Sequence, residues 1–197
     1  KETLHWGRWS RSAGRPRLKT NRKEVSCRLH TKLREAVHKQ MVSDVPVGSL
    51  LSGGLDSSAI TYFAREINPQ IQCFTIDIPG GPDLGGENDL PYARQVAREL
   101  RVPLEIVTVG PKQIQQSIEK MIYMLEEPQA DLAALNIYYL AQSARTTGIK
   151  VLLSGVGGDD LFSGYRRHYL RYLEPVQSLC PDFVWKSVSS MLSLFRS

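Results

Sequence analysis

Cysteine is scarce in this chain and follows no pattern. The 197 residues include three cysteines, Cys27, Cys73 and Cys180, which lie far apart and without CxxC spacing. A disulfide framework and a cysteine-ligated zinc site are therefore not indicated, and the three are interpreted as ordinary reduced thiols. The four histidines show no ligand spacing to one another either, so nothing indicates a metal centre built on imidazole.

Long apolar runs are also missing. No stretch approaches the roughly 18 to 20 consecutive apolar residues that a membrane helix needs, and the first residues are polar and basic rather than signal-like. A hydrophobic fraction of 42% nevertheless suffices for the core of one substantial domain. We therefore expect a soluble, cytoplasmic protein with no membrane association.

Acidic residues are rare at the N-terminal end. Residues 1–40 hold 12 Lys+Arg and 3 acidic residues, so the formal net charge of +5 originates there and the rest of the chain is acidic. A basic segment can contact nucleic acid, but residues 7–23 lack periodicity and are interrupted by Gly14 and Pro16. We interpret residues 1–23 as the remnant of an interdomain linker and do not expect a nucleic-acid partner.

Helix and strand patterns alternate through the rest of the chain. Apolar residues at helical spacing predict an amphipathic helix from about Glu24 to Met41. Short buried strands that end near positions 51, 78, 109 and 154 then alternate with helices over about 55–67, 92–100, 111–126 and 132–147, the last with Asp131 as a cap. This alternation predicts an α/β fold, a parallel sheet with helices on both faces.

Two of the predicted strands end in the same way. "LLSGG" at 50–54 and "LLSGV" at 152–156 both break from a buried strand into serine and glycine. In open parallel sheets, ligands bind beyond the carboxyl ends of the strands. If these two strands are parallel neighbours, both loops open on one crevice and form one composite site.

The first loop, "SGGLDSS", suits an anion. Ser52, Gly53 and Gly54 turn the backbone, and Ser57 and Ser58 open the next helix. Backbone N–H groups, hydroxyls and the positive end of a helix dipole together favour a phosphate or a pyrophosphate. The loop lacks both the GxxxxGK[ST] pattern of Walker A loops and the GxGxxG pattern of dinucleotide sites.

A carboxylate within this loop indicates a metal ion. Asp56 would repel a phosphate unless a divalent cation lay between them, and Mg²⁺ can bridge the two groups. Asp159 and Asp160 on the second loop would supply opposing ligands. Two alternatives stay open: Asp56 can simply cap its helix, and Asp160 can cap the helix that begins beside it.

The two motifs carry a family resemblance. "SDVPVGSLLSGGLDSSAI" at 43–60 and "VLLSGVGGDDLFSGY" at 151–165 closely resemble the synthetase domain of glutamine-dependent asparagine synthetases, within the PP-loop ATP pyrophosphatases. The resemblance covers roughly residues 24–175. It implies an adenine nucleotide alpha hydrolase-like domain over 24–175, and residues 176–197 as the start of a truncated C-terminal helical part.

The resemblance also implies a reaction. In the family, ATP adenylates a substrate carboxylate with release of pyrophosphate, and ammonia then displaces AMP to form an amide. This implies a carbon–nitrogen ligase of the asparagine synthase (glutamine-hydrolysing) type, converting L-aspartate to L-asparagine or acting on a related acceptor. The implied cofactors are ATP and Mg²⁺, and a glutaminase domain is expected upstream in the full-length protein.

Site residues are carried over by motif position. Asp56 and Asp159 would be the catalytic and metal-binding carboxylates. The residues that would contact ATP or pyrophosphate are Leu50, Ser52, Gly53, Gly54, Asp56, Ser57, Ser58, Ile76, Ser154 and Gly155.

One position departs from the family pattern. Asparagine synthetases usually carry a glutamate where this chain has Val156, and valine can neither move a proton nor hold an amine. Either Val156 merely packs and another group serves as base, or the acceptor differs, as in relatives of the β-lactam synthetase or glycan-carboxylate amidation kind. A fragment that only binds Mg·ATP and a tRNA-modifying PP-loop enzyme are the other hypotheses.

Overall fold

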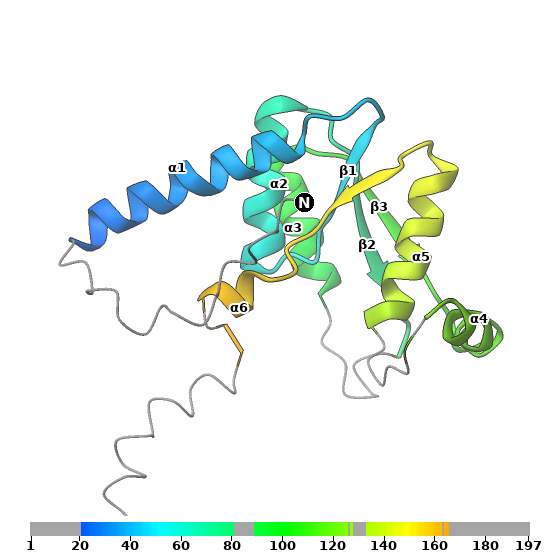
Figure 1. Ribbon diagram of the computed structural model, residues 1–197. Helices are drawn as coiled ribbons and strands as arrows, with labels where there is room; N and C mark the ends of the chain where they lie inside the picture. Colours follow the sequence, from blue (N-terminus) through cyan, green and yellow to red (C-terminus); the bar gives the residue numbers. More distant parts are fainter. Residues whose placement is uncertain (1–20, 81–88, 126, 128–132, 163, 166–197) are drawn as a thin grey trace, which may run out of the picture.

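A four-stranded parallel sheet forms the centre of the molecule (Figure 1). The computed structural model describes residues 21–80, 89–125, 127, 133–162, 164 and 165. The elements are α1 (Arg22–Gln40), β1 (Val47–Leu50), α2 (Leu55–Ile67), β2 (Cys73–Asp77), α3 (Leu90–Leu100), β3 (Leu104–Thr108), α4 (Pro111–Met124), α5 (Ala133–Thr146), β4 (Val151–Leu153) and α6 (Gly158–Phe162). The predicted alternation of strands and helices is confirmed over the described residues, while the proposed cap Asp131 lies outside them.

The strand order places the two similar strands side by side. The sheet runs β3-β2-β1-β4, and every pair in it is parallel. Val47 pairs with Val151 and Ser49 with Leu153, so β1 and β4 end at the same edge. The loops after β1 and β4 therefore leave the sheet side by side, as expected for two loops that open on one crevice.

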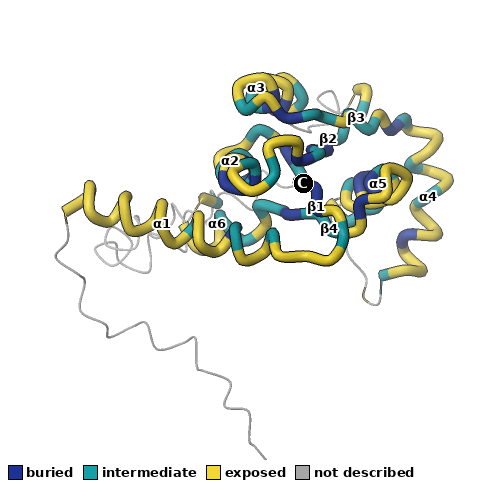
Figure 2. Tube along the Cα trace, turned by 90° about the horizontal axis from the view of Figure 1, so that it is seen from above, coloured by how far each residue is buried: buried dark blue, intermediate teal, exposed yellow. Residues whose placement is uncertain are grey.

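Helices cover both faces of the sheet. In Figure 2, α2 and α3 lie on one side of the strands, and α5 and α4 lie on the other. The first face buries an apolar cluster that includes Leu51, Phe63 and Ile71, and the second buries Phe74 and Leu140. The predicted two-sided α/β arrangement is thus confirmed.

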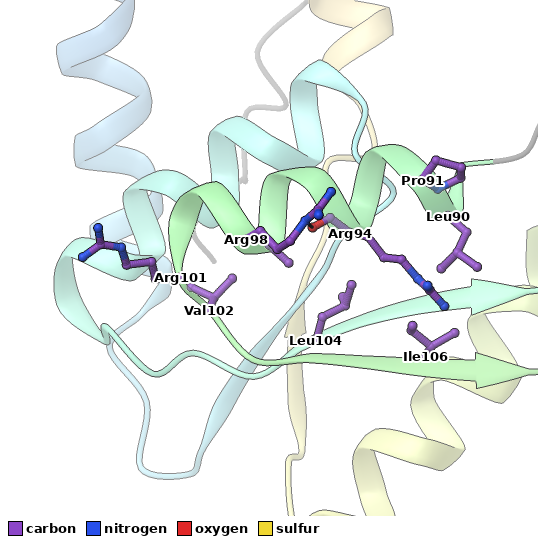
Figure 3. Close-up of a pocket in the computed structure, with 9 residues that line it drawn as sticks. Leu90, Pro91, Arg94, Arg98, Arg101, Val102, Leu104 and Ile106 are labelled. Atoms are coloured by element: carbon purple, nitrogen blue, oxygen red, sulfur yellow. Dashed lines mark hydrogen bonds between the residues drawn. The ribbon is translucent and has the colours of Figure 1, made fainter.

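The helix α3 also runs beside the edge strand β3. Figure 3 shows α3 along this strand, with Leu104 and Ile106 beneath the helix. A left-handed residue, Arg101 with φ 53°, ends the helix and turns the chain into β3. Ala93 and Ala97 on the inner side of α3 are buried, which lets the helix approach the sheet closely.

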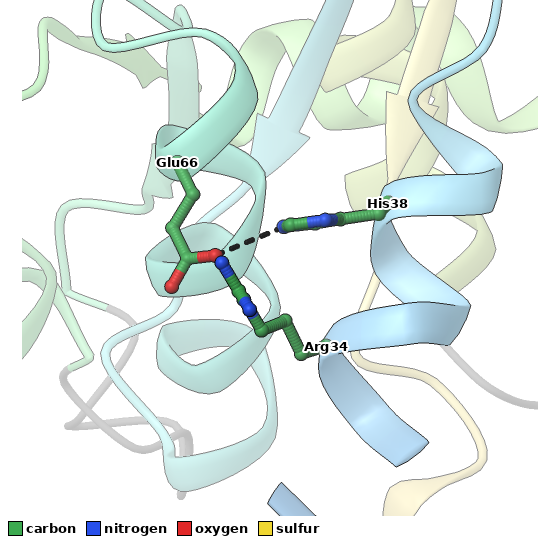
Figure 4. A network of polar contacts seen from close by, with 3 residues as sticks. All are labelled: Arg34, His38 and Glu66. Atoms are coloured by element: carbon green, nitrogen blue, oxygen red, sulfur yellow. Dashed lines mark hydrogen bonds and ion pairs between the residues drawn. The ribbon is translucent and has the colours of Figure 1, made fainter. Parts of the chain in front are cut away.

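A polar clamp fixes the C-terminal half of α1 to α2. Arg34 Nε donates to Glu66 Oε2 at 2.5 Å, and His38 Nε2 lies 3.0 Å from the same oxygen (Figure 4). The hydrogen bond from Arg34, followed by the one from His38, holds the pKa of Glu66 below its usual value. Val37 is buried on the same side of α1, so this half of the helix is docked by packing as well as charge.

No helix among the described residues is both long enough and apolar enough to cross a membrane.

Candidate functional site

The loops after β1 and β4 meet at the N-terminus of α2. A Cβ added to Gly155 would lie 2.8 Å from the Ser57 nitrogen and 3.0 Å from the Asp56 carbonyl carbon. Only a glycine lets the second loop approach the helix backbone this closely. The two motifs, far apart in sequence, therefore form adjoining walls of one site.

A cavity of about 590 Å³ opens between these walls. It is lined by Leu50, Leu51, Ser52, Gly54, Leu55, Asp56, Ser57, Phe74, Thr75, Ile76, Asp89, Ala133, Asn136, Ile137, Leu140, Ser154, Gly155, Val156, Asp159, Phe162 and Gly164. Its position beyond the carboxyl ends of β1, β2 and β4 is the usual ligand position in an open α/β sheet. Among the described residues that line it, three are acidic and none is basic.

Hydroxyl groups hold the first loop in shape. Ser52 Oγ lies 2.9 Å from Ser57 Oγ, and it also accepts from the Gly54 N–H at 3.3 Å. Ser57 Oγ donates to the Gly54 carbonyl at 3.2 Å. The loop is therefore preorganised by its own serines.

The N-terminus of α2 has no side-chain cap. Its first intrahelical bond runs from the Ser58 N–H to the Gly54 carbonyl at 3.0 Å, and Gly54 at the cap position offers no side chain. The N–H groups of Leu55, Asp56 and Ser57 precede that bond and carry the partial positive charge of the helix end. This end of α2 is suited to an anion because backbone donors and the dipole act together.

The two predicted carboxylates line the same cavity and lie near enough for the charge of one to affect the other. A Cβ on Gly158 would collide with the Asp56 carboxylate, and a Cβ on Gly164 would collide with that of Asp159. Partial burial, and secondarily the charge of Asp159, raises the pKa of Asp56 above its ordinary value. A divalent cation between the two carboxylates would remove this repulsion, so the donor set fits Mg²⁺ bound together with a phosphate.

A Mg²⁺ site here does not require the protein to supply all of the metal ligands. Among the described residues, no group of three or more His, Cys, Asp or Glu side chains is placed to hold a metal ion. Mg²⁺ commonly binds through one or two carboxylates, with water and substrate phosphates as the remaining ligands. Two neighbouring aspartates beside an anion site agree with that mode.

The second loop leaves Val156 exposed. Gly157 has φ 95°, a conformation that favours glycine, and Ser154 Oγ accepts from the Val156 N–H at 3.2 Å. This turn projects the Val156 side chain, which is 87% exposed, at the rim of the cavity. Within the described residues Val156 therefore does not pack against a neighbour.

Most of the predicted site residues line the same cavity, and three do not. The lining includes Leu50, Ser52, Gly54, Asp56, Ser57, Ile76, Ser154, Gly155, Val156 and Asp159. Gly53, with φ 85°, faces α3, and a Cβ there would collide with the backbone of Tyr92 and Ala93 in that helix. Ser58 Oγ is buried and has no hydrogen-bond partner among the described residues, and Asp160 is exposed on α6.

The wall contributed by α5 was not predicted. Ala133, Asn136, Ile137 and Leu140 line the cavity from this helix, opposite the first loop. The sequence places Leu135, Tyr139 and Leu140 on one apolar face, and that face is buried in the structure. Asn136 and Ile137 lie beside that face, and no pattern in the sequence assigns them to the cavity.

The fold and the cavity define an open parallel α/β protein with its site at the carboxyl ends of the strands. The family follows from comparison with known proteins: the family model described as asparagine synthase matches residues 28–192. The chain belongs to this family.

Individual relatives agree with that assignment. The chain is 35% identical over 131 residues to asparagine synthetase [glutamine-hydrolyzing] 1 of Bacillus subtilis, which covers 66% of the chain and 20% of that protein. It is 33% identical over 153 residues to asparagine synthetase B [glutamine-hydrolyzing] of Escherichia coli, with 70% and 26% covered. The chain thus spans about a fifth to a quarter of the length of these relatives.

Solved structures give more distant matches. NMN synthetase from Francisella tularensis matches with a TM-score of 0.41 and 16% identity, over 66% of this chain and 52% of that one. The U34-tRNA thiolase from Methanococcus maripaludis matches with a TM-score of 0.46 and 18% identity, over 74% of this chain and 51% of that one.

Proposed function

We propose that the chain is the synthetase part of an ATP-dependent amide-forming ligase. The single observation that supports this most is the meeting of "SGGLDSS" and "SGVGGDD" at one cavity, with an uncapped helix end and two neighbouring carboxylates. Membership of the asparagine synthase family supports the same reaction class. The location proposed for the protein is the cytoplasm, where ATP is plentiful.

The proposed reaction has two balanced steps. A carboxylate oxygen of the acceptor attacks the α-phosphorus of ATP, and the bond to the β-phosphate oxygen breaks, which releases pyrophosphate and leaves an acyl-adenylate. Ammonia then attacks the acyl carbon, loses a proton, and expels AMP as the amide forms. The protein's task in the first step is to hold the leaving pyrophosphate and stabilise the charge it develops.

The chain's own residues divide this task. The N–H groups that open α2, with the hydroxyls of Ser52 and Ser57, would hold pyrophosphate oxygens. Asp56 and Asp159 would hold Mg²⁺, which neutralises charge on the phosphates when bound. Leu50 and Ile76, at the ends of neighbouring strands, would contact the adenine or ribose, and Ser154 and Gly155 would lie along the nucleotide and its acyl group.

L-aspartate is the first acceptor to test, with ammonia supplied by a glutaminase domain in the full-length protein. This part of the proposal rests on the relatives, whose names include glutamine hydrolysis. Exposed Val156 at the rim marks the position where a different acceptor would be selected. A panel of carboxylates therefore belongs in the same experiment.

Release of pyrophosphate tests the proposal directly. The chain is incubated with Mg·ATP, ammonia and L-aspartate or other carboxylates, and pyrophosphate is measured alongside nucleotide binding. Substrate-dependent pyrophosphate that disappears in Asp56→Ala and Asp159→Ala, and persists in the exposed control Asp44→Ala, is the expected result. Nucleotide binding without any substrate-dependent pyrophosphate would refute ligase activity for this chain and leave a Mg·ATP-binding fragment.

The same assay distinguishes the amide-forming proposal from the hypothesis of a tRNA-modifying enzyme. That hypothesis requires ATP use that is stimulated by tRNA and weakened by salt. Pyrophosphate release that depends on tRNA and not on a small carboxylate would replace the amide-forming proposal.

A further inference from the structure

A second cavity lies away from the nucleotide site, between α3 and the edge strand β3. It has a volume of about 790 Å³, shares no lining residue with the first cavity, and is called here the α3–β3 groove. Its lining consists of Leu90, Pro91, Arg94, Ala97, Arg98, Arg101, Val102, Leu104 and Ile106 (Figure 3). The groove therefore combines one helix rich in arginine with one apolar strand.

The arginines form a single stripe of unneutralised charge. Arg94 and Arg98 lie four residues apart on one side of α3, and Arg101, the residue that ends the helix, lines the same groove. All three are exposed, no acidic residue lines the groove, and no ion pair involves them in the described part of the chain. Figure 3 shows the Arg94 side chain reaching along the groove toward Ile106.

Among the described residues, the strand under the groove is at the edge of the sheet, and half of its backbone groups have no partner strand. The β3 strand lies at one end of the described sheet order, and alternate residues of it bond to β2. The Cys73 N–H donates to the Pro103 carbonyl at 2.9 Å, and the Val109 N–H donates to the Asp77 carbonyl at 2.8 Å. In a parallel ladder the intervening residues direct their N–H and C=O groups away from the partner strand. For β3 these include Leu104 and Ile106, whose side chains line the groove.

We propose that the α3–β3 groove binds an acidic, extended segment of a partner polypeptide, which adds a strand to the edge of β3. Main-chain hydrogen bonds to Leu104 and Ile106 give such a segment its direction. Side chains of every second residue then face α3 at intervals of about 6.6 Å, close to the rise of about 6 Å between Arg94 and Arg98 on the helix. Glutamate or aspartate at those positions pairs with the arginines, while apolar neighbours cover the strand.

Charge argues against two other occupants. A second copy of this chain, paired through its own β3 in the antiparallel sense, would bring the two arginine stripes to the same face of the joined sheet, where like charges repel. A nucleic acid would find arginines for its phosphates, but the other described residues that line the groove are aliphatic and offer no aromatic ring on which a base could stack. An acidic peptide uses both the charge and the apolar strand.

Binding of a labelled peptide tests the proposal. The probe is a short fluorescein-labelled peptide in which glutamate alternates with valine and threonine, and a matched peptide carries lysine in place of glutamate. Fluorescence anisotropy with the whole chain measures affinity at low and moderate salt. The acidic peptide is expected to bind, to weaken as salt rises, and to be preferred over the lysine peptide.

Charge reversal locates the site. Arg94→Glu, Arg98→Glu and Arg101→Glu are combined in one variant, and Lys112→Glu, Arg145→Glu and Lys150→Glu, which are exposed and lie outside the groove, are combined in a control of equal charge. The groove variant should lose affinity by about tenfold or more, from three weak ion pairs, while the control keeps most of it. Circular dichroism establishes that both variants are folded.

Hydrogen exchange reports the binding mode. The amides of Leu104 and Ile106 should gain protection when the acidic peptide binds, since their N–H groups become part of a new ladder. Equal loss of affinity in the two variants, absence of binding at low salt, or binding that protects no amide of β3 would overturn the proposal. Tighter binding of a single-stranded RNA of similar charge, or self-association through the groove in sedimentation, would overturn it in favour of the other occupants.

Discussion

Replacing Gly155 by alanine should separate the two walls of the proposed nucleotide cavity. The added methyl group would lie 2.8 Å from the Ser57 nitrogen and 3.0 Å from two carbon atoms of Asp56. Two of these three atoms belong to the backbone of α2, so no side-chain rotation can make room for it. The loop after β4 must move away from the helix instead.

The expected loss of stability can be worked from opposing effects. Overpacking against atoms that cannot yield costs about 1–3 kcal/mol. Alanine also restricts the unfolded chain more than glycine does, which stabilises the folded state by about 0.4–1 kcal/mol. Taking the middle of each range, the net destabilisation is about 1.3 kcal/mol, which for a chain of this size lowers Tm by about 3–5 °C.

Thermal and urea denaturation of matched variants provides the measurement. Gly110→Ala is the control, because a Cβ there would meet only the flexible Gln113 side chain, at 3.7 Å. Affinity for Mg·ATP, followed by calorimetry, should fall in Gly155→Ala and stay unchanged in Gly110→Ala. If Gly155→Ala were as stable as the parent and bound nucleotide equally well, the close approach of the second loop to α2 would be refuted.

Three more predictions follow from buried or neighbouring groups. Asp56→Asn should stabilise the metal-free chain, because the folded-state pKa of Asp56 is raised above its ordinary value of 3.8. The gain in unfolding free energy should be absent below that pH and grow as pH rises. In denaturation experiments, Mg·ATP should remove this gain. Thr61→Val should cost about 1–3 kcal/mol in urea denaturation, because it leaves buried Ser49 Oγ without its 2.9 Å partner, and adding Ser49→Ala should recover part of the loss. Burial raises the pKa of Cys73 to about 12, so peptide mapping should find Cys27 alkylated in the folded chain and Cys73 modified only after unfolding.

The position of the cavity between the two loops was predictable because one simple pattern occurs twice. Two buried strands that both break into serine and glycine can share a crevice only if they are neighbours, and β1 and β4 are indeed paired in parallel. Helix limits were predicted nearly as well. The helix expected from about Glu24 to Met41 is observed as Arg22–Gln40, and that beginning at Leu55 ends at Ile67 as expected.

The remaining features depend on contacts that no local pattern contains. Asn136 and Ile137 line the cavity because α5 packs on the face of the sheet, and periodicity specifies a helix face without specifying its neighbour. Gly53 resembles a phosphate-loop glycine in the sequence, yet its most restrictive contact is with the backbone of Tyr92. The stripe of Arg94 and its two companions is visible in the sequence, but its alignment with an unpaired strand edge is not.

Because β1 pairs with β4, we expect the cavity between their loops to form late in folding. Pairing positions 47–49 with positions 151–153 closes a long loop of chain, and contacts of such long sequence separation form slowly. A partly folded chain that contains α2 and its serine loop still lacks the wall that carries Asp159. Capture of Mg·ATP should therefore appear last in a refolding time course, and a ligand that binds only the closed site will selectively stabilise completely folded molecules.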